Sequence, residues 1–367
     1  MEKYKVKDVT DYLESLAPLA LQESYDNSGL MVGSPNELVN GVLICLDITE
    51  EIIEEAIEEK CNLIIAHQPI VFSGLKKING NNYVERCVIK AIKNDIALYA
   101  AHTNLDNIAE GVNAKIADKL GLTKKRILAP KKELLKKLVT FCPTKHYEEV
   151  QNALFSAGCG EIGAYDECSF LSEGTGTFRA SESANPYIGK VNERHFEKET
   201  KIEVIFPSYL ENKVVAALKK SHPYEELAYD LIPLHNKHTY IGSGMLGELE
   251  KECLEMDFLK QLKQQFEAGG IRYTALLGKP IKTVAVCGGS GSFLLKDALA
   301  AKADIFITSD YKYHQFFDAE KRIIIADIGH YESEQFTKEL LFDIIRKKFS
   351  TFALRLTKIN SNPINYL

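Results

Sequence analysis

Two short segments of this 367-residue chain place a histidine four positions before a carboxylate. His102 precedes Asp106 directly after the apolar run IALYAA, and His330 precedes Glu334 directly after RIIIADIG. If the chain turns helical there, the two side chains of a pair lie on one helical face about one turn apart. Imidazole nitrogen and carboxylate oxygen are ligands for Zn²⁺, Mn²⁺ and Fe²⁺. The spacing therefore indicates a metal site, although a single such pair also fits a helix start whose acid balances the helix dipole.

A third histidine, His67, ends the apolar run LIIA, and a proline two positions later stops the strand because proline cannot donate to a ladder. In open α/β sheets, ligands bind at the carboxyl ends of the strands. We therefore expect the sheet to bring His67 to the same cleft as Asp106, His330 and Glu334.

The elements that must position these residues alternate between strand and helix patterns. In the first part of the chain we expect strands over 39–48, 61–67 and 96–102, and helices over 49–60, 81–95 and 111–122. Thr49 is placed to cap a helix and Gly121 to end one. From about residue 237 the plan recurs, with strands over 283–289, 303–310 and 322–330, helical segments over 292–302 and 313–321, and a long amphipathic helix over 332–349. Strict alternation predicts α/β layers.

The middle of the chain differs from its flanks. It runs β-α, then a Gly- and Ser-rich section over 171–189, then β-α-β, which is typical of a small ferredoxin-like α+β sandwich. The predicted fold class is thus α/β, with two similar α/β lobes over 1–129 and 237–367 and an inserted α+β domain over 130–236. The C-terminal lobe completes the metal site. Three histidines of the middle (146, 195 and 222) are not spaced as ligands, and we expect solvated or turn roles for them.

Composition narrows the function classes. The net charge is −6, and Lys and Arg are spread along the chain, which disfavours a nucleic-acid groove or a membrane-binding patch. No stretch reaches the roughly 18 to 20 apolar residues that cross a bilayer. The start carries charges where a signal peptide needs an apolar core, so we expect a cytoplasmic protein. The eight cysteines show no Cys-x-x-Cys spacing and are expected to be reduced core residues.

Two further segments lie where they could line the cleft. The glycine-rich run 288–291 falls between a strand and a helix, where its N–H groups could hold a phosphate or simply form a tight turn. After another strand come Asp310, Lys312 and His314. Asp310 or His314 could orient a ligand side chain, and Lys312 could neutralise a phosphate. The alternative is a merely polar strand end.

A resemblance runs through both lobes. The segments AHQPIVFSGLKK, AHTNLDNIAEGVNAKIADKLGL, CGGSG, ITSDYKYH and DIGHYESE resemble, in this order, the signature blocks of the Nif-three-like dinuclear metal family, often labelled GTP cyclohydrolase 1 type 2 homologues. YDNSGLMVG resembles the family's Trp-Asp-Asn-x-Gly-Leu block, with Tyr25 in the first place. The middle, with SHPYEELAYD, resembles the PII/CutA-like domain inserted in longer members. The resemblance implies a ring-shaped homohexamer whose subunits each hold two adjacent metal ions.

Carried over by position, the resemblance implies the ligands His67, Asp106, His330 and Glu334, with a second histidine at position 68. Here Gln68 stands instead. An amide oxygen is a weaker ligand than imidazole for Zn, Fe or Mn, so one of the two divalent ions is expected to be weakly occupied. Alternatively, His102 could complete the site, or Gln68 could bind through its oxygen and tune selectivity.

The same resemblance implies a metal-dependent hydrolase that acts on a small molecule of nucleotide type. Such a centre needs few other catalytic residues, and the sequence assigns none. A second hypothesis is a non-enzymatic metal-handling or regulatory hexamer, whose inserted domain senses a ligand.

Overall fold

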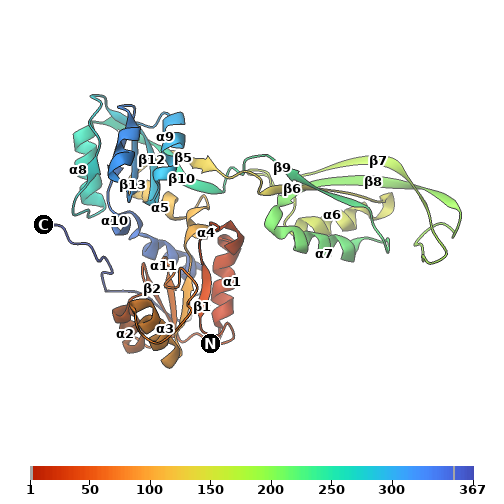
Figure 1. Ribbon diagram of the computed structural model, residues 1–367. Helices are drawn as coiled ribbons and strands as arrows, with labels where there is room; N and C mark the ends of the chain where they lie inside the picture. Colours follow the sequence, from red (N-terminus) through yellow and green to blue (C-terminus); the bar gives the residue numbers. More distant parts are fainter. Residues whose placement is uncertain (1–2, 350–351) are drawn as a thin grey trace. The chain divides into compact units, whose positions relative to one another are not determined.

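The computed structural model describes residues 3–349 and 352–367, and the chain forms two compact units (Figure 1). Unit 1 comprises Met1–Ala129 and Tyr240–Leu367, and unit 2 comprises Pro130–Thr239. Three sheets occur among the described residues. The predicted mixed α/β class is therefore confirmed.

The first sheet of unit 1 has the strand order β1-β4-β3-β2-β15. Its strands are β1 (Gly29–Val32), β2 (Gly41–Cys45), β3 (Leu63–Ala66), β4 (Ala97–Ala100) and β15 (Ala353–Leu356). All neighbours are parallel except β1, which runs antiparallel to β4. Every residue of β2, β3 and β4 is buried, as expected for parallel strands covered by helices on both faces.

Helices cover both faces of this sheet. The helices of the first half are α1 (Val6–Leu16), α2 (Glu50–Glu58), α3 (Tyr83–Lys93), α4 (Thr103–Asp106) and α5 (Val112–Lys119). Side chains of α2 and α3 pack with one face, and those of α1 pack with the other. Thr49 caps α2 as predicted, because its side chain accepts a hydrogen bond from the backbone N–H of Ile52 at 3.3 Å.

The second sheet of unit 1 has the order β11-β14-β13-β12-β10-β5. Its strands are β5 (Thr123–Pro130), β10 (Gly242–Cys253), β11 (Arg272–Tyr273), β12 (Ile281–Ser290), β13 (Ile305–Ser309) and β14 (Ile324–Asp327). The central three, β12, β13 and β14, are parallel, while β10 and β11 pair antiparallel with them. The helices of this part of the sequence are α8 (Glu255–Gln265), α9 (Leu295–Ala300), α10 (His330–Glu334) and α11 (Thr337–Lys348), with 3-10 turns at Ser292–Leu294 and Tyr313–Ala319. Of these, α11 packs against β15 and β2 of the first sheet.

The long helix expected over 332–349 is in fact two helices, α10 and α11, and the first begins earlier, at His330. At the break, the side-chain amide of Gln335 donates to the backbone carbonyl of Phe266 at 2.8 Å. The ring of Phe336 packs edge-on against Phe266, with centroids 5.5 Å apart. These contacts redirect the chain after Glu334 and separate the short helix from the long one.

The two sheets of unit 1 exchange strands. β15, from late in the chain, pairs in parallel with β2, whereas β5, from the first part of the chain, forms an edge of the second sheet. One continuous cluster of buried side chains includes Val42 and Leu63 from the first sheet and Val284 and Ile305 from the second. The two parts of the sequence that flank unit 2 therefore share a core.

Unit 2 is a four-stranded antiparallel sheet in the order β7-β8-β6-β9. Its elements are β6 (Leu135–Pro143), α6 (Tyr147–Ser156), β7 (Ser169–Arg179), β8 (Arg194–Pro207), α7 (Glu211–Ser221) and β9 (Tyr229–Leu234). The second half of β8 alternates buried and half-buried residues, so one face of the sheet carries the core. That core contains Val150 and Leu154 of α6 and Val214 and Leu218 of α7.

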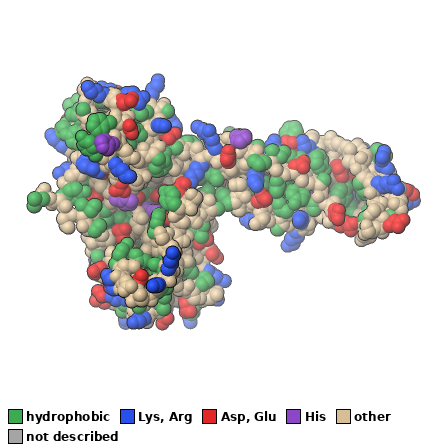
Figure 2. Space-filling model, viewed as in Figure 1, with side chains coloured by type: hydrophobic (Ala, Val, Ile, Leu, Met, Phe, Trp, Pro, Cys, Tyr) green, Lys and Arg blue, Asp and Glu red, His purple; other side chains and the backbone are tan. Residues whose placement is uncertain are grey.

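The distribution of surface charge and the state of the cysteines agree with the expectations from the sequence. On the face drawn in Figure 2, Lys and Arg are interspersed with Asp and Glu. No helix within 3–349 or 352–367 is long and apolar enough to cross a membrane. All eight cysteines are free thiols, and six of them are buried.

Candidate metal centre

Three histidines follow three strands of unit 1 at their carboxyl ends. His67 follows β3 and His102 lies two residues beyond β4, and these strands are parallel neighbours, so their carboxyl ends share one edge. His330 begins α10, three residues after the end of β14 in the second sheet. The predicted helical pair is present, because Nε2 of His330 lies 3.1 Å from Oε2 of Glu334 one turn later. His102 lies just outside its helix, at the N-cap of α4.

The three imidazoles share one hydrogen-bonding arrangement, in which an oxygen lies next to Nδ1. The pairs are His67 with the backbone oxygen of Ala101 at 2.8 Å, His102 with Oδ1 of Asp26 at 2.7 Å, and His330 with Oδ2 of Asp310 at 2.6 Å. An acceptor at Nδ1 keeps the proton there and fixes the ring. Each ring therefore presents Nε2 as a ligand atom.

Two carboxylates meet these nitrogens. Oε2 of Glu334, whose residue is only 2% exposed, lies 3.5 Å from Nε2 of His67. Oδ1 of Asp106 lies 3.7 Å from the same nitrogen. Nε2 of His67 and Oδ1 of Asp106 are buried, and neither has a hydrogen-bond partner among the described residues. Buried polar atoms without a partner are costly, and a cation between the two would satisfy both.

His102 belongs to the same cluster. Ligand atoms of His67, His102 and Asp106 all lie within 4.8 Å of one another, which makes these three a candidate metal-binding group. The sequence predicts His67, Gln68, Asp106, His330 and Glu334 as the principal set and His102 as an alternative member. All six side chains thus lie close to the carboxyl ends of strands from the two sheets of unit 1.

Gln68 faces the carboxylate and imidazole of the second pair. Its Nε2 donates to Oε2 of Glu334 at 2.7 Å and lies 3.2 Å from Nε2 of His330. An amide nitrogen is a donor and cannot bind a cation, so Gln68 becomes a ligand only if its amide turns to present Oε1. As a donor, Gln68 takes up the Oε2 atom of Glu334 and lies against Nε2 of His330, the two atoms that would otherwise face a metal ion.

The charges of the cluster are strongly coupled. Burial alone would lower the pKa of His67, but Glu334 and Asp106 raise it to about 9. Glu334 raises the pKa of His330 to about 11 against the opposing effect of burial. Burial alone would raise the pKa of Glu334. The neighbouring His330 and His67 lower it by more, so the pKa of Glu334 lies well below the usual range. The carboxylates therefore stabilise positive charge at this position, whether carried by protons or by a metal ion.

The glycine-rich run 288–291 forms the irregular end of β12 and the residue that follows it. Its backbone N–H groups at 288, 289 and 291 donate to the side chains of Asn113, Ser333 and Thr308. A Cβ atom on Gly289, where φ is +62°, would clash with Oε1 of Glu334. These N–H groups are therefore used within the fold, and Gly289 makes room for a carboxylate of the cluster.

Of the two side chains considered for orienting a ligand, Asp310 is the one in place, at Nδ1 of His330. His314 lies against the rings of Tyr313 and Phe317 instead, with centroids 5.2 and 6.3 Å away. In unit 2, His222 is buried at the end of α7 and contacts the backbone oxygen of Phe141, which is the expected turn role.

Sequence reasoning missed Asp26. Its carboxylate accepts hydrogen bonds from the backbone N–H and the hydroxyl of Thr103 and holds the ring of His102. Burial raises the pKa of Asp26, but the hydrogen bonds from His102 and Thr103 hold it well below the usual range. The available signal was the position of Asp26 inside YDNSGLMVG, one of the blocks that carried the resemblance.

Comparisons with known proteins identify the family. The model of the Duf34/NIF3 (NGG1p interacting factor 3) family matches residues 4–363, and the chain belongs to that family. It is 41% identical over 364 residues to the GTP cyclohydrolase 1 type 2 homolog of Halalkalibacterium halodurans, covering 98% of each chain. A Bacillus cereus protein related to NIF3 has a solved structure that matches with a TM-score of 0.86, 37% identity and complete coverage of both chains. The resemblance stated from the sequence is confirmed.

Proposed function

We propose that this protein binds divalent transition-metal ions through His67, Asp106, His330 and Glu334, with position 68 as the fifth member of the set. The observation that carries this proposal is that an oxygen lies at Nδ1 of all three imidazoles, while Nε2 of His67 lies near both Glu334 and Asp106 and Nε2 of His330 lies near Glu334. Mixed imidazole and carboxylate donors suit Zn, Fe or Mn. The residues therefore fit two adjacent ions, the one beside Gln68 being held more weakly.

The best-supported activity is hydrolysis of a small molecule of nucleotide type. When bound, divalent ions polarise a carbonyl or phosphoryl oxygen and lower the pKa of water. A space of about 260 Å³ is lined by ligand side chains and by the aromatic rings of Tyr25 and Phe72. These rings are 62% and 48% exposed, so they offer faces on which a base can stack. The name of the relative from Halalkalibacterium halodurans, GTP cyclohydrolase 1 type 2 homolog, points to the same substrate class.

Turnover of a nucleotide panel tests this activity. Metal-loaded wild-type protein is expected to convert at least one purine nucleotide, and the His330→Ala variant is expected to lose both metal and turnover. If the wild-type protein holds metal but converts no nucleotide, the metal-site proposal is retained and the proposed nucleotide hydrolase activity is rejected.

That second outcome corresponds to the other candidate, a non-enzymatic metal-handling or regulatory protein. Gln68 favours it, because an amide next to His330 and Glu334 weakens one ion position. Rapid exchange of one ion with a chelator, together with no turnover, would support this alternative.

We also propose that the protein is a cytoplasmic homo-oligomer, most simply a homohexamer, and that unit 2 is a PII/CutA-like domain of ferredoxin type. The element order β-α-β-β-α-β and the antiparallel order β7-β8-β6-β9 support the ferredoxin-like assignment. Closed symmetry is the rule for soluble oligomers. Light scattering should give six times the subunit mass of 41.2 kDa, and a monomer at micromolar concentration would reject the hexamer.

A further inference from the structure

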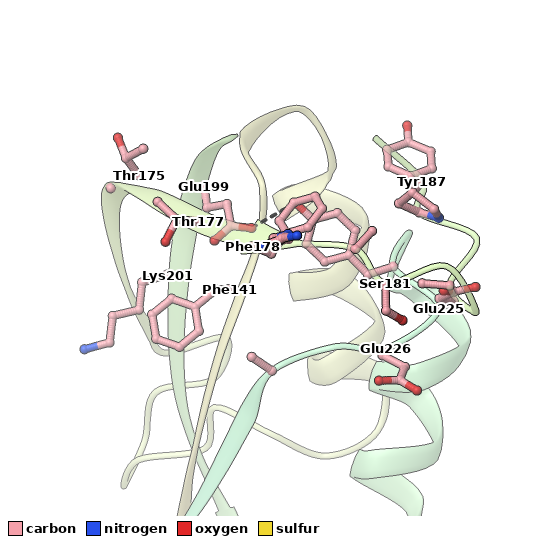
Figure 3. A pocket seen from close by; sticks show the side chains of 18 of the residues that line it. Phe141, Thr175, Thr177, Phe178, Ser181, Tyr187, Glu199, Lys201, Glu225 and Glu226 are labelled. Carbon is pink, nitrogen blue, oxygen red and sulfur yellow. Dashed lines mark hydrogen bonds between the residues drawn. The ribbon is translucent and has the colours of Figure 1, made fainter. Parts of the chain in front are cut away.

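Unit 2 contains a cavity of its own, of about 970 Å³. It is formed by β7 and β8, by the Gly- and Ser-rich segment that links them, and by the loop after α7, including Tyr224–Glu226. Figure 3 shows side chains that line it. No residue of the metal cluster lines this cavity, so its binding properties depend on its own lining residues.

Aromatic rings form the middle of the cavity. Phe178 and Tyr187 come from β7 and the segment after it, and Tyr224 comes from the loop after α7. The ring of Tyr224 lies 6.1 Å from that of Phe178 and 6.3 Å from that of Tyr187, centroid to centroid. The faces of such rings attract cations and also pack well against methylene groups.

A carboxylate lies against one side of this aromatic group. Tyr224 donates its hydroxyl hydrogen to Oε1 of Glu199 at 2.9 Å. A Cβ atom at Gly176 would clash with the carboxylate of Glu199, so the glycine of β7 leaves the space in which this carboxylate lies. Gly176 thus admits an acidic group to the cavity.

Two more carboxylates lie on the other side. Figure 3 shows Glu225 and Glu226 across the aromatic side chains from Glu199. The loop that carries them is tied to the segment after β7, because Glu225 accepts a hydrogen bond from the backbone N–H of Asn185 at 2.9 Å. The cavity therefore has acidic groups at two ends and aromatic rings between them.

Negative charge dominates the lining. Four carboxylates (Glu173, Glu199, Glu225 and Glu226) face two basic side chains (Arg179 and Lys201). The ammonium of Lys201 is already paired with Glu203 and is directed away from the rings in Figure 3. Burial, followed by the hydrogen bond to Glu199, raises the pKa of Tyr224, as a negatively charged setting requires. A phosphate-bearing ligand would need the opposite balance of charge.

We propose that this cavity binds a linear aliphatic polyamine. One terminal ammonium group lies at Glu199, the other at Glu225 and Glu226, and the methylene chain crosses the rings of Phe178 and Tyr224. The arrangement uses the acids at the two ends of the cavity and the ring faces of Phe178 and Tyr224 at its centre. It is independent of the function proposed for the metal centre.

Isothermal titration of the full-length protein with spermidine tests the proposal, with ATP and the uncharged 1,8-octanediol as comparison ligands. Wild-type protein is expected to bind spermidine, and neither comparison ligand. Glu199→Gln keeps an acceptor for Tyr224 but removes the charge, and is expected to weaken binding about tenfold, the loss typical of one charged hydrogen bond. The double variant Glu225→Gln/Glu226→Gln should weaken binding at least as much.

Glu161→Gln is the matched control, since it removes one exposed carboxylate of unit 2 that does not line the cavity, and it is expected to bind as the wild type does. Thermal melting verifies that each variant is folded, and the exposed pair at 225 and 226 gives a test that does not disturb the core. Equal spermidine affinity in all variants would overturn the proposal, as would binding of ATP or of the diol in place of spermidine.

Discussion

An imidazole ligand depends on the group that holds its other nitrogen. Asp310 lies 2.6 Å from Nδ1 of His330 and adopts a left-handed backbone with φ of +56°. Asparagine tolerates that conformation, so Asp310→Asn removes the charge with little strain. We expect this variant to bind metal about 10- to 100-fold more weakly, as is typical when the partner of a ligand histidine is lost.

Competition with a chromogenic chelator measures the affinity of the Asp310→Asn protein. Asp318→Asn, an exposed carboxylate of the following 3-10 turn, is the control and should leave the affinity unchanged. Equal affinity in both variants would show that Asp310 does not support the site.

Gln68 provides the second test at the level of single residues. Its amide nitrogen donates to Glu334, where an imidazole would supply a ligand atom instead. Gln68→His is therefore expected to raise the metal-to-subunit ratio and to strengthen the weaker of two binding steps. Calorimetric titration of metal-stripped wild type and variant measures both. Two steps of similar affinity in the wild type, unaltered by the substitution, would indicate that another side chain, such as His102, completes the site.

How much of the site could be predicted depended on distance along the chain. The pair of His330 and Glu334 is one helical turn apart, and His67 and Asp106 follow strand-like runs, so sequence patterns sufficed to name them. The contact between Asp26 and His102 joins positions 76 residues apart and depends on how β1 and β4 pair. The spacing of apolar residues along the sequence cannot predict such a contact, because the contact is produced by tertiary structure.

At the level of elements, the end of β12 links backbone conformation to the metal cluster. Gly289→Ala would strain a residue with φ of +62° and press its Cβ atom against Glu334. We expect a loss of stability of at least about 1 kcal/mol, because a non-glycine residue is disfavoured there, together with lower metal content. Gly278→Ala is a matched control, since Gly278 has φ of +74° but open space around its Cβ position. Equal metal content in the two variants would show that metal binding does not depend on the close approach of Gly289 to Glu334.

Asp304 joins the beginnings of β12 and β13. Its Oδ2 accepts from the backbone N–H groups of Lys282 and Thr283 at 2.9 and 2.8 Å, and its Oδ1 pairs with Lys279. Burial raises its pKa, but Lys279 and the two backbone groups lower it more, so that its pKa is below the usual value. The ionised form is therefore the one that stabilises the fold.

For a group whose pKa is lowered on folding, the stabilisation is complete above the unfolded value of about 3.9 and disappears as the pH falls through the folded value. Asp304→Asn should thus lose about 1–3 kcal/mol at pH 7, from one weakened set of buried hydrogen bonds, and progressively less below about pH 4. Urea denaturation at several pH values measures this, with the exposed Asp343→Asn as control. A pH-independent difference would contradict the assigned role.

Local patterns identified elements whose apolar side chains repeat regularly. The strands β2, β3 and β4 and the helices α2, α3 and α5 lie within the ranges expected from the sequence. β15 was missed because only four residues form it and most of them are exposed, which leaves no apolar run to detect. β10 was missed because three glycines interrupt its apolar residues. Both strands owe their existence to a partner strand far away in sequence.

At the level of the whole molecule, unit 2 has a separate core. Its buried cluster draws only on residues between 138 and 218, whereas the clusters of unit 1 draw on none of them. Removing 130–239 and joining Ala129 to Tyr240 is therefore expected to leave a folded protein that keeps its metal. Circular dichroism and elemental analysis measure the two properties. An unfolded product with the metal lost would show that unit 1 needs unit 2.

The exchange of strands between the sheets of unit 1 constrains how the chain is made. During synthesis, residues 41–45 leave the ribosome long before residues 353–356, so β2 has an open parallel edge until β15 is available. The same delay applies to the cluster, because His330 and Glu334 are translated after the whole of unit 2. During much of its translation, a nascent chain therefore contains His67 and Asp106 without His330 and Glu334. In the same interval, a chaperone or a neighbouring chain that covers the β2 edge would protect the nascent chain from aggregation.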